Sequence, residues 1–395
     1  MFESKIIIFV STFVNENMIQ RQIETIIVDY LRKSNKSKAI LLFGARQVGK
    51  TTLLKTISEE LSIPTLYLNG DEADVKEQLS NTTSAKLSLL FGDNKLVIID
   101  EAQAIPNIGT TLKLITDNLS QIKLIATGSS AFELANRANE PLTGRKFEYS
   151  LYPISFAEMV KHHGFLNETR MLEHRLIYGY YPEIVTSVGE EEKLLKFLAS
   201  SYLYKDLLML EEIKRPALLG KILKVLALQI SNEVSYNEIA QLVGANIQTV
   251  EKYIDMLEQA YVIFKLPAFS RNIRNEIKKG KKFYFWDNGI RNAIIGNFLP
   301  VSKRTDIGAL WENFIISERL KIISYNSIDV SSYFWRTAQQ QEIDYIEEEN
   351  GTFSVYEFKW NENKKAKFSK SFTEAYQTTV EKTITPKNIE EFLLV

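Results

Sequence analysis

The sequence of 395 residues contains no cysteine, which excludes disulfides, thiolate metal centres and a cysteine nucleophile. Its three histidines, His162, His163 and His174, lie in one short stretch, so a histidine-built metal centre elsewhere in the chain is excluded as well. The formal net charge is −1, so no global field draws the molecule toward nucleic acid or membrane. Any basic surface on this protein therefore has to be local.

Long apolar runs are also missing. The one membrane-like segment, Ile6–Val14, is far shorter than the ~20 residues that span a bilayer. It also lacks the basic region and the small-residue cleavage site of a signal peptide. We therefore expect no membrane association and a cytoplasmic location. The first clean helical pattern opens at Met18, so we interpret residues 1–17 as an extension.

Residues 18–155 have the pattern of an α/β domain. Short apolar runs alternate there with helical or polar segments, which is typical of buried strands in a parallel sheet covered on both faces. The predicted strands are Ala39–Phe43, Thr65–Leu68, Leu96–Ile99, Lys123–Ala126 and Phe147–Leu151.

The segment after the first predicted strand fits the phosphate-loop pattern G-x-x-x-x-G-K-[ST] in full, and a predicted helix follows it. Backbone N–H groups of such a loop, together with the positive end of the helix dipole, bind the phosphates of a nucleotide. Lys50 would reach the β- and γ-phosphates, and the Thr51 hydroxyl would ligate Mg²⁺. The predicted ATP-binding residues are Gly44, Ala45, Arg46, Gln47, Val48, Gly49, Lys50, Thr51 and Thr52.

Two carboxylates, Asp100 and Glu101, end the third predicted strand. Asp100 would hold Mg²⁺ through water, and Glu101 would orient or deprotonate the water that attacks the phosphate. The next strand ends in small polar residues, of which Thr127 or Ser129 would contact the γ-phosphate or its water. The alternative is that the serine only caps the following helix. Guanine-binding proteins carry an Asn-Lys-x-Asp segment that this sequence lacks, so we expect ATP.

Arg145 is the remaining candidate for the ATPase site. Its guanidinium would stabilise charge on the leaving phosphate, either in cis or from a neighbouring subunit, so oligomerisation is left open. A surface salt bridge between Arg145 and Glu148 is the alternative.

Residues 156–215 are helical in pattern and suit a lid or linker. Residues 216–300 predict a winged helix, because Ser235–Glu238 opens one helix, Gly244 turns the chain, and Ile247–Gln259 forms a second helix. Wing strands are expected at Tyr261–Leu266 and Lys281–Trp286.

The surface of this module gives mixed indications about nucleic acid. The second helix is net acidic in its exposed residues, which argues against its approaching phosphates; these are Gln248, Glu251, Lys252, Asp255 and Glu258. The wing 271–282 is basic and lies beside aromatic residues, which suits contact with a nucleic-acid backbone; it carries Arg271, Arg274, Lys278, Lys279, Lys281 and Lys282. The alternative is a module that docks proteins.

Residues 301–395 predict a helix, Ala309–Ile323, and then a hairpin around Asn350-Gly351. Its arms carry Asp344, Glu357 and Lys359, the last two on one face of their strand. The two carboxylates would hold Mg²⁺, joined by Glu312 from the helix, while Lys359 positions or activates a water that attacks a phosphodiester. A solvent-facing ion pair is the alternative interpretation. The pattern favours a restriction-endonuclease-like fold.

Taken together these motifs resemble prokaryotic AAA+-like ATPases whose carboxyl-terminal half is a domain of unknown function. The likeness runs from about Met18 to the end of the chain; beyond the residues above it includes Pro153–Glu158, Tyr204-Lys205-Asp206, Tyr284–Arg291, Trp311–Phe314 and Trp335–Asp344. It implies an AAA-type nucleotide domain, a winged-helix linker and a nuclease-like terminal domain. Ala45, where proline is usual, and Tyr180, where a second glycine is usual, depart from the pattern.

Two functions follow from this interpretation. The first is an ATP-driven machine on nucleic acid that uses the carboxylates at Asp344 and Glu357. The second is a nucleotide-switched signalling ATPase whose winged-helix and terminal domains dock protein partners without cutting nucleic acid.

Overall fold

The computed structural model describes residues 18–33, 38–128, 142–209, 215–270, 280–337, 339–364 and 366–394, with residues 201–209 described in their backbone only. The expected extension 1–17, the candidate Ser129 and positions 271–279 of the basic wing lie outside the described residues.

The amino-terminal part is built on one parallel sheet in the order β2-β3-β4-β1-β5, which confirms the predicted α/β class. Its strands are β1 (Ala39–Phe43), β2 (Thr65–Asn69), β3 (Leu96–Asp100), β4 (Lys123–Gly128) and β5 (Lys146–Ser150). Every residue of β1 and β3 is buried, as expected for central strands covered on both faces.

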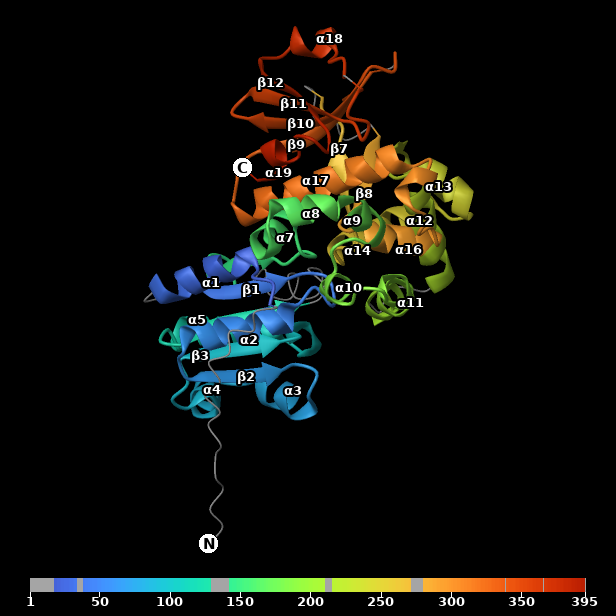
Figure 1. Ribbon diagram of the computed structural model, residues 1–395. Helices are drawn as coiled ribbons and strands as arrows, with labels where there is room; N and C mark the ends of the chain where they lie inside the picture. The colour runs from blue at the N-terminus through green and yellow to red at the C-terminus, as the bar shows by residue number, and fades with distance from the viewer. Residues whose placement is uncertain are drawn as a thin grey trace.

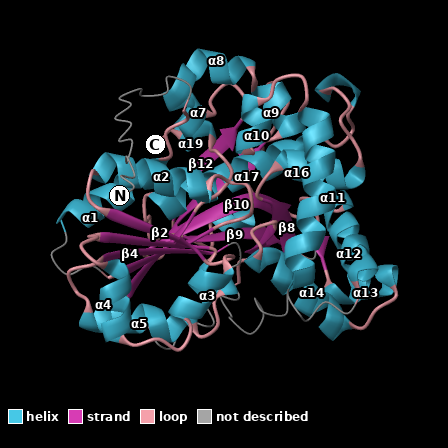
Figure 2. Ribbon diagram, turned by 90° about the horizontal axis from the view of Figure 1, so that it is seen from below, coloured by secondary structure: helices cyan, strands magenta, loops and turns pink. Residues whose placement is uncertain are grey.

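Helices cover both faces of this sheet (Figure 2). On one face lie α1 (Gln22–Lys33) and α2 (Lys50–Leu61), and on the other α3 (Ala73–Leu79), α4 (Ser84–Phe91) and α5 (Ile108–Asn118). Alternate residues of β1 divide between the two layers: Ile40 and Leu42 belong to the core with α1 and α2, whereas Leu41 and Phe43 belong to the core with α4 and α5.

The middle of the chain is mostly helical. It contains α7 (Phe156–His163), α8 (Phe165–Arg170), α9 (Leu172–Tyr178), α10 (Pro182–Thr186), α11 (Glu191–Met209), α12 (Pro216–Leu228), α13 (Tyr236–Val243), α14 (Ile247–Gln259) and α16 (Asn288–Ile295). A small sheet, β6-β8-β7, joins them, with β6 (Glu233–Val234), β7 (Ile263–Pro267) and β8 (Lys281–Phe285). Gly244 has φ 70° between α13 and α14, a left-handed conformation that glycine adopts at low cost.

The carboxyl-terminal part begins with α17 (Ile307–Tyr325) and packs it against a four-stranded sheet, β12-β11-β10-β9. Its strands are β9 (Ser331–Arg336), β10 (Glu342–Glu349), β11 (Thr352–Phe358) and β12 (Thr378–Ile384), and α18 (Lys370–Thr373) and α19 (Glu390–Leu393) are short. The predicted hairpin at Asn350-Gly351 is present, with β10 and β11 antiparallel. The sequence pattern did not indicate β12, because this edge strand alternates little and only one of its seven residues is buried.

Helix α17 lies between this terminal sheet and helices α7, α8 and α9 (Figure 1). It is buried almost all round, so it forms a shared core element rather than a surface helix. No helix in the described part of the chain is long and apolar enough to cross a membrane.

Candidate functional site

The phosphate loop connects the end of β1 to the start of α2, as predicted. Gly49 is the N-cap residue of α2, so no capping side chain covers the first amides of the helix. Three loop residues have positive φ: Gly44 (155°), Gln47 (57°) and Gly49 (95°). Of the predicted residues, Gly44, Ala45, Val48 and Lys50 are buried, Arg46 and Gly49 are half-buried, and Gln47, Thr51 and Thr52 are exposed.

Gly44 is required by a close approach of two backbones. A Cβ atom at this position would lie 2.2 Å from the carbonyl oxygen of Leu151, the residue that follows β5. The amide of Leu151 in turn donates to the Phe43 carbonyl at 2.7 Å. The loop is therefore held against the strand beside it by a contact that only glycine allows.

Lys50 is 6% exposed and lies over the loop itself. Its Nζ donates to the carbonyl oxygens of Gly44 and Ala45, both at 2.9 Å. A buried ammonium at the mouth of the loop places positive charge beside the amides that would bind phosphate.

Asp100, at the end of β3, is the centre of a hydrogen-bonded group. Its Oδ2 accepts from Thr51 Oγ1 at 2.8 Å and from the Tyr67 hydroxyl, and its Oδ1 accepts from the Thr127 hydroxyl. Burial raises the pKa of Asp100, but the hydrogen bonds from Thr127, Tyr67 and Thr51 outweigh burial and hold that pKa below its usual value. The side chain is therefore a carboxylate at neutral pH.

Tyr67 on β2 is a member of this group that sequence reasoning missed. Its register partner on β3 is Ile98, two residues before Asp100, so the Tyr67 side chain lies on the same face of the sheet as that of Asp100. A long polar side chain at that strand position was the available signal.

Glu101 has a left-handed backbone, with φ 50°, which is costly for a residue other than glycine. Its amide donates to Asp100 Oδ1 and to Thr127 Oγ1, both at 3.2 Å, and its carboxylate accepts from the Gln103 amide. Glu101 is half-buried, and its positive φ turns the chain sharply after Asp100, at the carboxyl edge of the sheet.

Arg145 lies at the opposite edge of the sheet. Its carbonyl accepts from the amide of Ala39, the first residue of β1, whereas the phosphate loop follows the last residue of β1. The four residue steps of β1 separate the two edges by about 13 Å. Arg145 therefore does not reach the phosphate loop of its own chain, which overturns the expected role in cis.

The alternative salt bridge between Arg145 and Glu148 is also wrong. Arg145 Nε pairs instead with Asp117 Oδ1 at 2.5 Å, and Glu148 pairs with Lys146. Residues 145 and 148 differ by three positions on or beside β5, so their side chains leave opposite faces of that strand.

A cavity of about 250 Å³ opens beside the phosphate loop. It is lined by Val48, Gly49, Thr52, Leu53 and Thr56 of the loop and α2, and by Met18, Ile19, Arg21, Glu24, Ile154, Pro182 and Thr186 from the start of the chain and the helical part. The cavity therefore has apolar walls and lies next to the amides of the loop.

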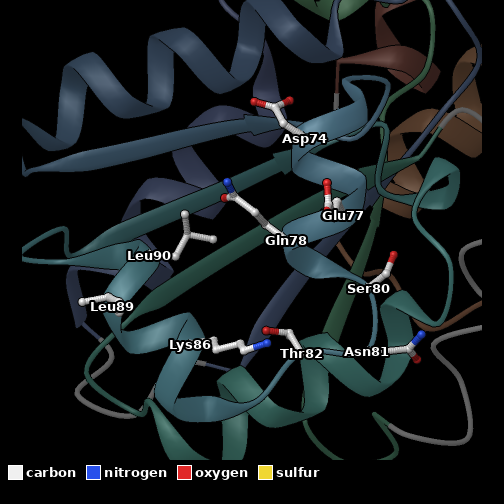
Figure 3. A pocket seen from close by; sticks show the side chains of 9 residues that line it. All are labelled: Asp74, Glu77, Gln78, Ser80, Asn81, Thr82, Lys86, Leu89 and Leu90. Atoms are coloured by element: carbon white, nitrogen blue, oxygen red, sulfur yellow. The ribbon is translucent and has the colours of Figure 1, made fainter.

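Two larger cavities lie away from the predicted ATPase residues. One, of about 510 Å³, separates α3 from α4 and is lined by Asp74, Glu77, Gln78, Ser80, Asn81, Thr82, Lys86, Leu89 and Leu90 (Figure 3). The other, of about 690 Å³, is bordered by α7, α9 and α10 and includes the three histidines. The histidines His163 and His174 are already bonded to Glu168 and Glu191, at 2.7 and 3.2 Å.

The terminal hairpin brings Asp344 and Glu357 together with Lys359 between them. Lys359 Nζ lies 3.1 Å from Asp344 Oδ2 and 2.7 Å from Glu357 Oε2. Burial, together with the charge of Asp344, raises the pKa of Glu357 to about 7. Asp344 and Glu357 are both buried residues.

Glu312, on α17, has partners from the preceding sheet. Its Oε1 accepts from Lys282 Nζ at 3.1 Å and from the Tyr284 hydroxyl at 2.6 Å. Lys282 also pairs with Glu342 at 2.7 Å. Burial raises the pKa of Glu312 to about 7, an effect that Lys282 opposes and Asp344 reinforces.

Lys282 is 1% exposed, so it does not belong to a basic wing on the surface. This corrects one position of the expected nucleic-acid contact at 271–282, because Lys282 is used inside the molecule to neutralise Glu312 and Glu342. Lys281, beside it, donates to the Tyr236 hydroxyl at 3.2 Å. Among the described residues, no group of three or more histidine, aspartate or glutamate side chains is arranged to hold a metal ion.

Comparisons with known proteins agree with this architecture. Residues 36–160 match an AAA domain family, residues 169–300 match a domain of unknown function (DUF8612), and residues 307–390 match another (DUF4143). An uncharacterized protein of Mycobacterium tuberculosis is 25% identical over 333 residues, which cover 83% of this chain and 71% of that protein. One from Haemophilus influenzae is 23% identical over 351 residues, covering 84% and 82%.

Among solved structures, the RuvB Holliday junction branch migration motor of Thermotoga maritima is 15% identical, with a TM-score of 0.32, and the match covers 66% of this chain and 95% of that one. The AAA match confirms the resemblance drawn from the motifs. Residues 36–160 are therefore similar to an AAA domain, and residues 307–390 are similar to a domain of unknown function.

Gly44→Ala tests whether the loop depends on the contact with Leu151. The added Cβ has no room, so we expect a loss of roughly 3 kcal/mol in the free energy of unfolding, from urea denaturation, and loss of ATP binding. Gly144→Ala is the matched control, because Gly144 also has positive φ but nothing within 4 Å, and should cost only about 1 kcal/mol. Equal losses in the two variants would contradict this explanation.

Glu357→Gln tests the buried carboxylate pair. Because the pKa of Glu357 is raised in the folded state to about 7, the native protein binds the extra proton between about pH 4.5 and 7, and its stability falls as pH rises through that window. Between pH 5 and pH 8 the free energy of unfolding should therefore fall by about 2 kcal/mol less in the variant than in the parent. Urea unfolding at the two pH values measures this difference. Parallel pH profiles would show that Glu357 is not perturbed.

Proposed function

We propose that this ATPase hydrolyses Mg²⁺-bound ATP at the phosphate loop. The observation that carries the proposal is the hydrogen bond of 2.8 Å between Thr51 Oγ1 and Asp100 Oδ2. A hydroxyl from the start of the helix and a carboxylate from the neighbouring strand end form the oxygen-donor pair that suits a magnesium ion on the phosphates.

The other residues of the loop take roles that follow from their positions. The amides of Gly44–Thr52 bind the phosphate oxygens, and the Lys50 ammonium exchanges its bonds with the Gly44 and Ala45 carbonyls for bonds to the β- and γ-phosphates. Mg²⁺, when bound, neutralises the charge that develops on the phosphates. The cavity lined by Ile19, Leu53, Ile154 and Pro182 accepts the adenine base, since it is apolar and adjoins the loop.

Glu101 orients and deprotonates the attacking water. Its carboxylate lies one residue beyond Asp100, and Gln103 holds it by a hydrogen bond. Thr127 supports this arrangement by bonding both Asp100 and the Glu101 amide, and Ser129, two residues on, is proposed as a further contact to the γ-phosphate.

Lys50→Met and Glu101→Gln separate binding from chemistry. We expect Lys50→Met to weaken ATP binding by about tenfold to 100-fold, because a charge-assisted contact is lost. Glu101→Gln should keep ATP binding but lower kcat at least about 100-fold, because the general base is removed. Calorimetry and phosphate release measure the two quantities. Lys55→Met, on the exposed side of the same helix, is the control and should match the parent.

Arg145 is proposed to act on the ATP of a neighbouring subunit. Its place at the far edge of the sheet leaves it close to no phosphate of its own chain, and its side chain is partly exposed and held by Asp117. A guanidinium supplied from a second subunit stabilises the charge of the transferred phosphate.

Mixing two inactive variants tests this assembly. Arg145→Ala alone should lower kcat by roughly 1000-fold, and Glu101→Gln is inactive for a different reason. An equimolar mixture should recover part of the activity, because some subunits then combine an intact Glu101 with a neighbour's Arg145. A mixture as inactive as its components would exclude action between subunits.

For the terminal domain we propose action on a phosphodiester. Asp344, Glu357 and Lys359 are together on the hairpin, and the carboxylates suit Mg²⁺, which would polarise a phosphate oxygen while Lys359 positions water.

The preceding module, with its turn at Gly244 and its small sheet, is proposed to be a winged helix. The burial of Lys282 favours the second function, a signalling ATPase that docks proteins, because it removes one basic residue from the wing.

Incubation with DNA or RNA in Mg²⁺ or Mn²⁺ decides between the two functions. Nucleic-acid cleavage that Asp344→Asn abolishes, with ATP turnover unchanged, would establish the nuclease. Stimulation of ATP turnover by nucleic acid without cleavage would leave an ATP-driven machine that grips its substrate. Absence of cleavage, binding and stimulation would favour the signalling function. Glu349→Gln, on the same hairpin but exposed, is the control.

A further inference from the structure

We propose that Arg21 is a positioning residue that orients the phosphate loop and transmits its nucleotide state to α17. Through α17 this state would reach the carboxylates of the terminal domain. The inference rests on the proposed binding of ATP at the loop.

Arg21 stands one residue before α1 and directs its three nitrogen atoms to three different places. Nη1 donates to the Val48 carbonyl of the phosphate loop at 2.8 Å, and Nη2 donates to the Tyr152 carbonyl at 2.6 Å. Nε donates to Glu158 Oε1 at 3.2 Å. The side chain is 9% exposed, so these bonds are shielded from water. A planar guanidinium can serve all three acceptors, and a lysine ammonium cannot reproduce that fork.

The bond to Val48 acts directly on a phosphate-binding group. The Val48 carbonyl and the Gly49 amide belong to the same planar peptide unit, so a bond that holds the oxygen also fixes the direction of the N–H. Arg21 thereby aims the Gly49 amide, and a phosphate that pulls on the amide also pulls on Arg21.

The partner of Arg21 on α7 is itself held firmly. Glu158 accepts from the amides of Ser155 and Gln22, each at 2.8 Å, and Ser155 caps α7 in return. Arg21 therefore works against a fixed anchor, and a shift of its guanidinium is passed on through its third partner, Tyr152.

Tyr152 connects Arg21 to the end of α17. The same residue whose carbonyl accepts from Arg21 donates its amide to the Tyr325 hydroxyl at 3.1 Å and its own hydroxyl to Ser324 at 3.3 Å. Two further bonds fasten this end: the Phe156 amide donates to Glu318 at 2.7 Å, and Lys321 donates to the Ile154 carbonyl at 3.2 Å. The segment that connects β5 to α7 is therefore bonded to the end of α17, and the two move as one unit.

The other end of α17 lies at the carboxylate site. Glu312 accepts from Lys282 and Tyr284, and Lys282 also pairs with Glu342, which lies two residues before Asp344 on β10. Glu312 and Tyr325 are thirteen residues apart on one helix, or about 20 Å at 1.5 Å per residue. Because α17 is buried on nearly every side, it has no room to bend, so a displacement at Tyr325 is carried to Glu312.

Hydrogen exchange of the whole protein, with and without saturating ADP or a non-hydrolysable ATP analogue, tests the inference. In the parent we expect slower exchange on nucleotide binding in peptides covering the phosphate loop and in peptides covering 312–326. Arg21→Ala should weaken nucleotide binding about tenfold, change kcat much less than KM, and abolish the change at 312–326 even at saturating nucleotide.

Three further variants remove ambiguity. Arg21→Lys keeps the positive charge but cannot donate to all three acceptors, so it should behave like Arg21→Ala. It also provides a test if the alanine variant fails to fold. Tyr325→Phe should reduce the response at 312–326 at saturating nucleotide, because it removes the hydroxyl that accepts from the Tyr152 amide and also interacts with Arg21. Arg32→Ala changes an exposed arginine in the last turn of α1, paired with Glu60, and should match the parent.

The outcomes separate two failures. A parent that binds no adenine nucleotide overturns the proposed function and this inference with it. A parent that binds nucleotide but shows no change at 312–326, or an Arg21→Lys variant that keeps both affinity and that change, overturns this inference alone.

Discussion

The parallel register of the amino-terminal sheet is the constraint on which the ATPase site depends. Parallel strands end at the same edge, so the loop after β1, the carboxylate of Asp100 after β3 and the hydroxyl of Thr127 in β4 meet there. The same register sends Arg145, which precedes β5, to the opposite edge. One geometric rule thus brings these groups together within the chain and keeps Arg145 away from them.

Buried charges connect the parts of the molecule to one another. Arg21 and Glu158 lie between the phosphate loop and α7, Glu318 and Lys321 lie between α7 and α17, and Lys282 reaches Glu312 across the boundary with the terminal domain. Removing one member of such a pair leaves an uncompensated buried charge, so these contacts restrict the parts to one relative arrangement. The proposed link between the phosphate loop and the terminal domain depends on contacts of this kind.

The α/β class, the five strands and the phosphate loop could be predicted because each depends on local pattern. Apolar runs of four or five residues, glycines at set positions and a helix start are all visible within a window of about ten residues. The hairpin at Asn350-Gly351 was predictable for the same reason, and so was the pairing of Asp344 with Glu357 across it. Strand β12 was not, because an exposed edge strand has little alternation to detect.

The sequence by itself determined which residues can bind phosphate and magnesium, since that chemistry requires glycines, a lysine, a hydroxyl and a carboxylate in a short order. Only the tertiary structure decided the partners of Arg21, Tyr67, Lys282 and Arg145. Each of these side chains acts on a residue far away in the chain, and whether an arginine or lysine faces solvent or a buried carboxylate depends on packing that no local pattern records.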